Sequence, residues 1–321
     1  MLSIVIPVFN EEESLVPLHK EISEVAQENQ YNELEIVFVD DGSSDSSWSI
    51  IEKLSQADSR VHGIRFRKNF GKAAALQAGF CEVKGDLVIT MDADLQDDPH
   101  EIPRFLEKIN LGFDCVSGWK KVRHDPWHKV YPSHVFNWMV SRLTKVVLHD
   151  HNCGMKCYRR EIFDEIVLYG EMHRFVPVLA GSRGYKVGEI VINHRAREFG
   201  KSKYGFTRIF KGFMDLLTVK FVTSYGQRPL HLLGNFGLGV FSLGAMGVFL
   251  MAILWILTRC CPWCAAQCGG IFSVSNHPAM ALFSAIFIIV GAQFLCAGVL
   301  AELVTSFNQK PGQNYSVKTK I

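Results

Sequence analysis

The stretch Asp86-Leu87-Val88-Ile89-Thr90-Met91-Asp92-Ala93-Asp94-Leu95-Gln96 joins an apolar run to two carboxylates and an amide. The apolar run is typical of a buried strand, and the polar side chains follow where such a strand reaches solvent. In open α/β sheets, ligands bind at that edge. Mg²⁺ and Mn²⁺ take such oxygens as ligands together with the phosphates of a substrate. The stretch therefore predicts an α/β sheet with a metal and diphosphate site at its edge.

A lone Asp-x-Asp is more often a pair of turn residues, here before the helix that follows Pro99. Acidic residues also follow two other predicted strands of this chain. An acidic turn at 39–45 follows a second apolar run, and a third strand pattern at 2–9 leads into Asn10-Glu11-Glu12-Glu13. The repetition favours a functional edge over an incidental turn.

Strand and helix patterns alternate along the first two thirds of the chain. This alternation predicts a Rossmann-like α/β fold with a mostly parallel sheet and helices on both faces. No Gly-x-Gly-x-x-Gly or P-loop pattern occurs, so phosphates must be held by something other than a glycine loop, and a metal is the obvious substitute. We expect strands at 2–9, 34–38, 61–66, 86–91, 113–118 and 185–192 with a short one before 160, and helices at 15–25, 48–54, 71–80, 99–109, 133–148 and from 160.

Two long uncharged runs follow in the last third, from Leu230 to Thr258 and from Ala279 to Ala301. Each exceeds the ~20 residues that cross a bilayer. As buried helices of a soluble protein they would outsize the core available to them, so we expect two transmembrane helices at about 230–258 and 279–304. Lys and Arg flank the pair on the outside, and the connecting loop carries only Arg259, which predicts an integral membrane protein with both termini cytoplasmic, in the plasma membrane if bacterial.

The segment between these regions, 205–228, has apolar residues at helical spacing with Arg208, Lys211 and Lys220 among them. Such a helix either lies in the headgroup layer or packs on the globular core, and its proximity to the first span favours the membrane interface. The expected organisation is a cytoplasmic catalytic domain at 1–204, juxtamembrane amphipathic helices at 205–228, a two-helix membrane region at 229–305 and a cytoplasmic tail at 306–321.

The net charge argues against one class of partner, and the cysteines indicate which parts of the chain lie in a reducing compartment. A formal charge of +2 on 321 residues argues against nucleic acid, because a phosphate-backbone binder shows a basic stripe. Cys81, Cys115, Cys153 and Cys157 have the pattern of small buried residues in a reducing compartment. Cys260, Cys261, Cys264 and Cys268 cluster in the loop between the spans, where disulfides are favoured over zinc and unpaired thiols remain an alternative.

Several short motifs, in this order and spacing, resemble the inverting family 2 glycosyltransferases with a GT-A fold. The resemblance is to the polyprenyl-phosphate branch, which includes dolichol-phosphate mannose synthases and bacterial enzymes that glycosylate undecaprenyl phosphate. It covers nearly the whole chain. The motifs are Pro7-Val8-Phe9-Asn10-Glu11-Glu12, Asp40 to Asp45, Asn69-Phe70-Gly71-Lys72, Asp92 to Gln96, Asp150 with Gly154-Met155-Lys156, Arg174-Phe175-Val176-Pro177, and Arg197-x-x-Gly-Lys-Ser-Lys203-Tyr204.

The resemblance implies a role for each matching residue. By this resemblance, the nucleotide is bound by Pro7, Phe9, Glu11, Asp41 and Asp92. The metal, Mg²⁺ or Mn²⁺, is bound by Asp92, Asp94 and Gln96. The residues implied to act in catalysis are Asp94, Asp150, Arg197 and Lys203, and those implied to bind the acceptor are Lys120 and Arg174. The Gln-x-x-Arg-Trp signature of processive synthases is absent, so we expect transfer of a single sugar.

The implied partners are a nucleoside-diphosphate sugar, with UDP or GDP, a polyprenyl phosphate and the lipid bilayer. A lipid phosphate is mostly dianionic at neutral pH, since its second pKa is about 6, so Asp150 acts either as a base or to orient the acceptor. A hydroxyl-acceptor enzyme that makes a glycolipid is one alternative, and a non-catalytic sugar-nucleotide-binding scaffold is another. Glycines on the first span, Gly234 to Gly247, leave self-association into a homo-oligomer open.

Overall fold

The structure is a computed structural model that describes residues 1–121, 127–166, 168, 170, 172–195, 207–225, 228–260 and 278–308. The backbone packs as two compact units, one within Met1–Lys220 and the other within Phe221–Asn314. The division falls inside the predicted juxtamembrane segment 205–228, whose role remains a prediction.

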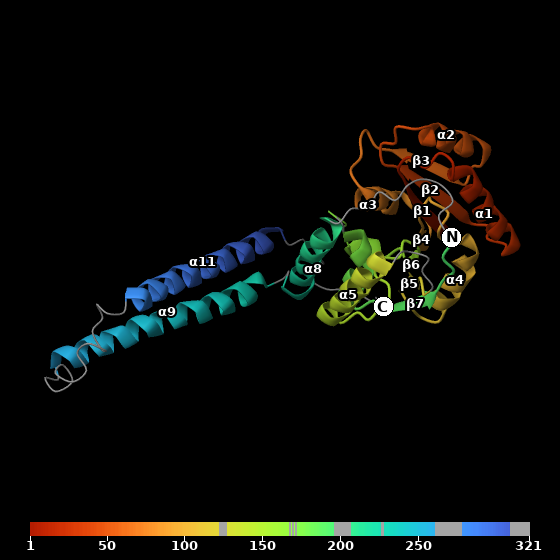
Figure 1. Cartoon of the computed structure of the whole chain (residues 1–321). Coiled ribbons are helices and arrows are strands. Elements are labelled where there is room, and N and C mark those ends of the chain that lie inside the picture. The colour runs from red at the N-terminus through yellow and green to blue at the C-terminus, as the bar shows by residue number, and fades with distance from the viewer. Residues whose placement is uncertain are drawn as a thin grey trace. The chain divides into compact units, whose positions relative to one another are not determined.

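The first unit is built on a seven-stranded sheet in the order β3-β2-β1-β4-β6-β5-β7 (Figure 1). The order reverses between β1 and β4, because β1 pairs in parallel with β2 on one side and with β4 on the other. Only β6 runs antiparallel to its neighbours, β4 and β5. The predicted mostly parallel sheet is thus confirmed. The strands are β1 (Leu2–Val8), β2 (Leu34–Asp40), β3 (Val61–Arg65), β4 (Leu87–Thr90), β5 (Cys115–Trp119), β6 (Lys156–Arg159) and β7 (Val187–Val191).

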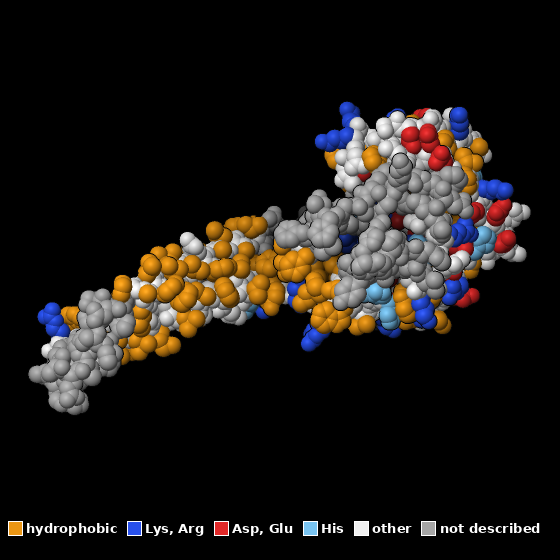
Figure 2. Space-filling model, in the orientation of Figure 1, with side chains coloured by type: hydrophobic (Ala, Val, Ile, Leu, Met, Phe, Trp, Pro, Cys, Tyr) orange, Lys and Arg blue, Asp and Glu red, His pale blue; other side chains and the backbone are white. Residues whose placement is uncertain are grey.

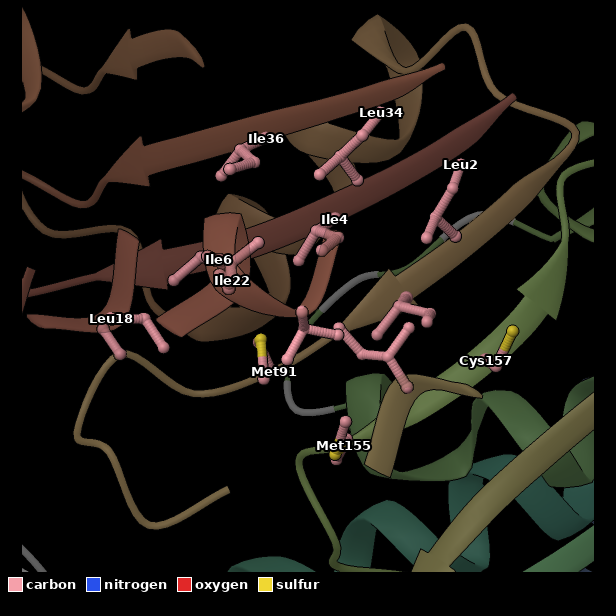
Figure 3. Close-up of a cluster of buried hydrophobic side chains, with 14 of the residues drawn as sticks. Leu2, Ile4, Ile6, Leu18, Ile22, Leu34, Ile36, Met91, Met155 and Cys157 are labelled. Atoms are coloured by element: carbon pink, nitrogen blue, oxygen red, sulfur yellow. The ribbon is translucent and has the colours of Figure 1, made fainter. Parts of the chain in front are cut away.

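Helices cover both faces of this sheet, as the sequence predicts. One buried cluster joins the sheet to α1, α2 and α4, and Figure 3 shows its members Ile4, Ile6, Leu18 and Ile22. The other joins the sheet to α3, α5, α7 and α8. Strands buried on both faces are apolar at nearly every position, which is why β1 and β2 appear as continuous apolar runs. The helices are α1 (Leu15–Glu28), α2 (Ser47–Ala57), α3 (Lys72–Glu82), η1 (Pro99–Glu101), α4 (Ile102–Asn110), α5 (Trp127–Thr144), α6 (Ile162–Glu165), η2 (Met172–Phe175), α7 (Val176–Ser182) and α8 (Thr207–Tyr225).

Some boundaries differ from the sequence prediction. The helix expected at 133–148 begins earlier, at Trp127, and ends at Thr144 because Lys145 adopts a left-handed backbone with φ of 64°. The helix expected from 160 is only the short α6. Cys115, Cys153 and Cys157 are buried as expected, whereas Cys81 is exposed.

Helix α8 presents two different faces within the first unit. Leu216 and Val219 are buried in the core beside the sheet. Phe213, Met214 and Leu217 on its other side are 39–45% exposed. Core packing, one of the two alternatives for this helix, therefore occupies one face, and the described part of the chain leaves a second, apolar face exposed.

The second unit contains two long helices, α9 (Pro229–Cys260) and α11 (Pro278–Asn308). Pro229–Leu257 and Pro278–Phe307 are long and apolar enough to cross a membrane, with mean hydropathies of 2.4 and 2.3. On the face seen in Figure 2, hydrophobic side chains lie along the length of both helices. Cys261, Cys264 and Cys268 lie outside the described residues.

Glycines bring α9 and α11 into close backbone contact. A Cβ at Gly237 would lie 2.8 Å from the Gly291 carbonyl oxygen, and one at Gly244 would lie 2.6 Å from the Ser284 carbonyl oxygen. Small residues permit this approach in membrane helices. Gly237 and Gly244 of α9 therefore contact α11 of the same chain. Gly239, by contrast, has nothing within 4 Å of its ideal Cβ position. Self-association remains a prediction.

Candidate functional site

Asp92, two residues after the end of β4, carries the first carboxylate of the Asp-x-Asp motif. The Lys72 ammonium at the start of α3 donates a hydrogen bond to its Oδ1, and the Asp92 side chain is 31% exposed. Burial acts to raise the pKa of Asp92, but the charge and hydrogen bond of Lys72 overcome it and hold the pKa at about 2. The carboxylate is therefore ionised at neutral pH, and a cation already lies against it.

The backbone of Gly154 also lies against this carboxylate. A Cβ at this position would lie 2.6 Å from Asp92 Oδ2 and 2.8 Å from its Cγ. The Gly154 carbonyl accepts a hydrogen bond of 2.8 Å from the Thr90 hydroxyl, which ties the start of β6 to β4. Only a residue without a side chain lets the two segments approach this closely.

The rest of the motif forms a tight and strained turn. Asp94 is 8% exposed, and its Oδ1 accepts a hydrogen bond of 3.2 Å from the Gln96 backbone N–H. Leu95 between them has a left-handed φ of 60°, which is costly for a branched side chain and persists only where surrounding contacts enforce it. The turn keeps Asp92, Asp94 and Gln96 at one edge of the sheet.

Asp97 is a site residue that the sequence prediction missed. It is fully buried, its Oδ1 lies 2.9 Å from Lys120 Nζ, and its Oδ2 accepts a hydrogen bond of 3.3 Å from the Asp92 backbone N–H. Burial acts to lower the pKa of Lys120, but Asp97 more than offsets this and raises it. Lys120, predicted to bind the acceptor, thus forms an ion pair with a residue that is hydrogen-bonded to the motif. Its role toward an acceptor stays a prediction. The run of acids at 92–98 was the available signal for Asp97.

The ends of β1 and β2 are tied to each other beside this turn. The Asn10 backbone N–H donates to Ser43 Oγ at 2.9 Å, and Asn10 Oδ1 accepts from the Ser44 backbone N–H at 2.8 Å. Asn10 has a left-handed φ of 55°. The neighbouring Glu11 backbone N–H donates to Ser47 Oγ at 3.0 Å. Pro7, Phe9 and Glu11 therefore lie along one sheet edge with the acidic motif, and their nucleotide contacts stay predictions.

Asp41, at the end of β2, holds the segment that leads into α3. Its Oδ1 accepts from the Phe70 backbone N–H at 2.7 Å, and its Oδ2 accepts from the Gly71 backbone N–H at 2.9 Å. Burial raises the pKa of this carboxyl, and the two backbone hydrogen bonds oppose that rise. Because α3 begins at Lys72, Asp41 indirectly positions the lysine that pairs with Asp92. This anchoring role was not predicted, and the predicted contact with the base remains untested.

The remaining predicted residues divide into two groups. Asp150 is 1% exposed, and its Oδ1 accepts from the Asn152 backbone N–H at 3.0 Å, which shapes the turn before Gly154. Arg174 is 6% exposed and lies close to Gly212 of α8. Arg197 and Lys203 lie outside the described residues. The roles predicted for all four stay predictions.

A second acidic group includes Asp98, which lies two residues after the motif. Ligand atoms of Glu21, Asp98 and His100 fall within 4.8 Å of one another, an arrangement that resembles a metal site. The Arg195 guanidinium, however, donates to Glu21 Oε2 and to Asp98 Oδ1, both at 2.7 Å. Its positive charge compensates both carboxylates. This group is best explained as an ion-pair network that anchors Arg195 to α1 and to the turn before η1.

His151, next to Asp150, makes the stability of the folded protein depend on pH. The ring is fully buried, its Nε2 lies 3.1 Å from Ser141 Oγ, and burial, followed by the charge of Lys156, lowers its pKa to about 3. The unfolded chain takes up a proton near the ordinary pKa of about 6.5, while the folded chain does not. This contribution to stability is therefore fully present above about pH 6.5 and is lost as the pH falls toward 3.

We expect the unfolding free energy of His151→Gln to decrease less steeply with acidification than that of the unchanged protein. One proton corresponds to about 1.4 kcal/mol per pH unit, so the two curves should converge by about 2 kcal/mol between pH 6.5 and 5. Guanidinium unfolding of the full chain in detergent, followed by tryptophan fluorescence, measures this. His62→Gln, at an exposed position of β3, is the control. Parallel curves for unchanged protein and His151→Gln would rule the assignment out.

Comparison with known proteins agrees with this architecture. The sequence model described as glycosyl transferase family 2 matches residues 3–167. The chain is 39% identical over 306 residues to the undecaprenyl-phosphate 4-deoxy-4-formamido-L-arabinose transferase of Salmonella choleraesuis (strain SC-B67), covering 94% of this chain and 88% of the relative. The enzyme of that name from Salmonella paratyphi B (strain ATCC BAA-1250 / SPB7) matches with the same identity and coverage.

Solved structures show the same fold at low sequence identity. Glucosyl-3-phosphoglycerate synthase from Mycobacterium tuberculosis, in complex with Mn²⁺, UDP and phosphoglyceric acid, superposes with a TM-score of 0.54 at 16% identity and covers 70% of this chain and 78% of its own. Its complex with Mn²⁺ and UDP-glucose superposes with a TM-score of 0.53 at 15% identity, with the same coverage. The match to the family model over half of the chain and the 39% identity to the transferases show that this chain belongs to the family 2 glycosyl transferases.

Proposed function

We propose that this glycosyltransferase moves a single sugar from a nucleoside-diphosphate sugar to a polyprenyl phosphate at the cytoplasmic face of a membrane, with the help of a divalent cation. The observation that carries the proposal is the ionised Asp92 carboxylate at the end of β4, which contacts both the Lys72 ammonium and the Gly154 backbone. The names of the relatives at 39% identity support the acceptor class.

The donor set fits a hard divalent cation. Asp92 and Asp94 offer carboxylate oxygens and Gln96 an amide oxygen, all from one short turn. The Lys72 ammonium against Asp92 indicates that positive charge is stabilised at this point of the sheet edge. Mn²⁺ together with UDP in the structural neighbour supports the same assignment. When bound, the cation would neutralise charge on the departing diphosphate, and Asp92, Asp94 and Gln96 would hold it.

The chain's own residues supply the remaining electrostatics. Charge builds on the diphosphate as the sugar leaves, and stabilisation that is stronger in the transition state than in the ground state accelerates transfer. Arg197 and Lys203 are the basic residues proposed to contact that charge. A phosphate acceptor needs no general base at neutral pH, because its second pKa is about 6. We therefore assign Asp150 to orienting the acceptor.

Two features support a membrane location for the reaction. Helices α9 and α11 each have the length and hydropathy of a membrane span. In the first unit, α8 exposes Phe213, Met214 and Leu217, which suits a helix that lies in the headgroup layer. We propose that the bilayer is the partner of both surfaces and that both termini are cytoplasmic, as the distribution of Lys and Arg predicts.

The test compares two acceptors that differ only in the phosphate. Purified full-length protein with Mn²⁺ is offered undecaprenyl phosphate or undecaprenol, and radiolabelled UDP-4-deoxy-4-formamido-L-arabinose, UDP-glucose and GDP-mannose serve in turn as donors. We expect one sugar per lipid with the phosphate from at least one donor, and at least about 100-fold less product with the alcohol, which lacks the charge-assisted contacts of the phosphate. Preferred transfer to the alcohol would identify a glycolipid-forming enzyme, and donor binding without transfer to either would identify a scaffold.

A further inference from the structure

A small cavity is lined by residues of α3, β4, β6 and the segment that leads into α7, and two of its lining residues, Lys72 and Gly154, contact the Asp92 carboxylate. It offers about 10 Å³ to the centre of a water-sized group, which is room for roughly one water molecule or one phosphoryl oxygen. Both apolar and polar side chains line it. The lining residues are Lys72, Leu76, Phe80, Thr90, Asn152, Cys153, Gly154, Lys156, Tyr158, His173 and Val176.

Lys156, the first residue of β6, places a cation in the wall of this cavity. The residue is 3% exposed, and its Nζ donates to the backbone carbonyl of Cys153. Within the described part of the chain, its ammonium forms no ion pair. A buried ammonium without a carboxylate is costly, and such groups are retained mostly where they bind or react with something.

Other basic groups surround the same space. Lys72 and His173 also line it. Burial lowers the pKa of Lys156, and Lys72 lowers it further, although Cys153 and Asp150 oppose the shift. Burial, Lys72 and Arg174 lower the pKa of His173 well below its ordinary value, and Asp92 opposes this. After burial, the charge of Lys72 thus lowers the pKa of both Lys156 and His173, as expected in a region of positive potential.

We propose that this cavity is an anion subsite, in which Lys156 binds one terminal oxygen of a phosphoryl group and Lys72 at the mouth contacts another. The size decides how much enters: one oxygen fits and a whole phosphate does not. The ligand class is a phosphate monoester or the terminal phosphate of a diphosphate. The inference deepens the proposed function, because Gly154 and Lys72 connect the cavity wall directly to Asp92.

A purely structural role for Lys156 makes a different prediction. In that case its hydrogen bond to Cys153 only stabilises the turn that carries Gly154. The affinity of the protein for a phosphate-bearing ligand would then not depend on the charge of the residues that line the cavity. Asn152→Asp separates the two explanations, because it adds negative charge to the lining of the cavity while Lys156 keeps its bond to Cys153.

The experiment measures binding of two probes to the full chain in detergent with EDTA, so that no divalent cation contributes. The probes are farnesyl phosphate, which represents the lipid acceptor, and UDP, which represents the donor side. We expect Lys156→Met and Asn152→Asp to weaken at least one probe about 10- to 100-fold, the loss typical of a hydrogen bond to a charged group. The controls Lys53→Met on α2 and Asn32→Asp change exposed positions outside the cavity.

The pattern of losses identifies the ligand. A loss confined to farnesyl phosphate assigns the subsite to the acceptor, a loss confined to UDP assigns it to the donor, and a loss of both means that the two phosphates share it. Unchanged affinity for both probes in folded Asn152→Asp overturns the proposal, whether or not Lys156→Met folds. Because no sugar or metal is present, that failure would leave the proposed transfer reaction untouched.

Discussion

Asp94→Asn is expected to lower the rate of sugar transfer to undecaprenyl phosphate about 100- to 1000-fold, the cost of removing one group that stabilises charge in a transition state. The change keeps the size of the side chain and its ability to accept the 3.2 Å hydrogen bond from the Gln96 backbone N–H. It removes the negative charge that a divalent cation requires. The loss should therefore appear in turnover and in Mn²⁺ affinity rather than in folding.

The matched control is Asp86→Asn, which makes the same chemical change at the other end of β4, where the side chain is 89% exposed. Rates are measured with saturating donor over a Mn²⁺ titration, and melting temperatures without metal report on folding. If Asp94→Asn turned over as fast as Asp86→Asn at every Mn²⁺ concentration, Asp94 would have no part in the site.

Gly154→Ala should weaken Mn²⁺ binding about 10- to 100-fold, although residue 154 has no side chain to act as a ligand. The added methyl group would lie 2.6 Å from Asp92 Oδ2, which is too close for the carboxylate to stay where it now accepts a hydrogen bond from Lys72. It must therefore move away from its position. Displacing a group that orients a metal ligand commonly costs this much affinity. Gly239→Ala, where nothing lies within 4 Å of the new Cβ position, is the control.

A double-mutant comparison shows whether the effect of Gly154→Ala passes through Asp92. If it does, adding Asp92→Asn to Gly154→Ala lowers Mn²⁺ affinity little further than Asp92→Asn alone, because residues in contact are not additive. Electron paramagnetic resonance of free Mn²⁺ gives the affinities. Fully additive losses would mean that Gly154 acts on another part of the protein.

Much of the fold could be predicted because burial on both faces leaves a clear trace in the sequence. The continuous apolar runs of β1 and β2 and the spacing of Leu15, Leu18 and Ile22 in α1 have a single reasonable interpretation. The antiparallel direction of β6 could not be predicted, since pairing direction depends on partners far away in the chain. The end of α5 was misplaced because a left-handed Lys145 has no signature in its own sequence.

The site shows the same division between local pattern and long-range contact. The motif at 92–96 could be recognised as a strand end with ligand oxygens. The contacts that shape it could not, because Lys72, Asp97 and Gly154 meet Asp92 only through tertiary folding. Lys120 illustrates the limit: the resemblance assigned it to acceptor binding, but nothing in the local sequence predicted its ion pair with the buried Asp97.

The most direct test of the whole account is the metal dependence of a single transfer. Purified protein is treated with EDTA, supplied with undecaprenyl phosphate and a radiolabelled donor that it accepts, and then titrated with Mn²⁺. The account predicts product near background in EDTA, recovery of the full rate as Mn²⁺ is added, and no recovery in the Asp92→Asn, Asp94→Asn double variant. Transfer that persists at the full rate after thorough chelation, or in that double variant, would contradict it.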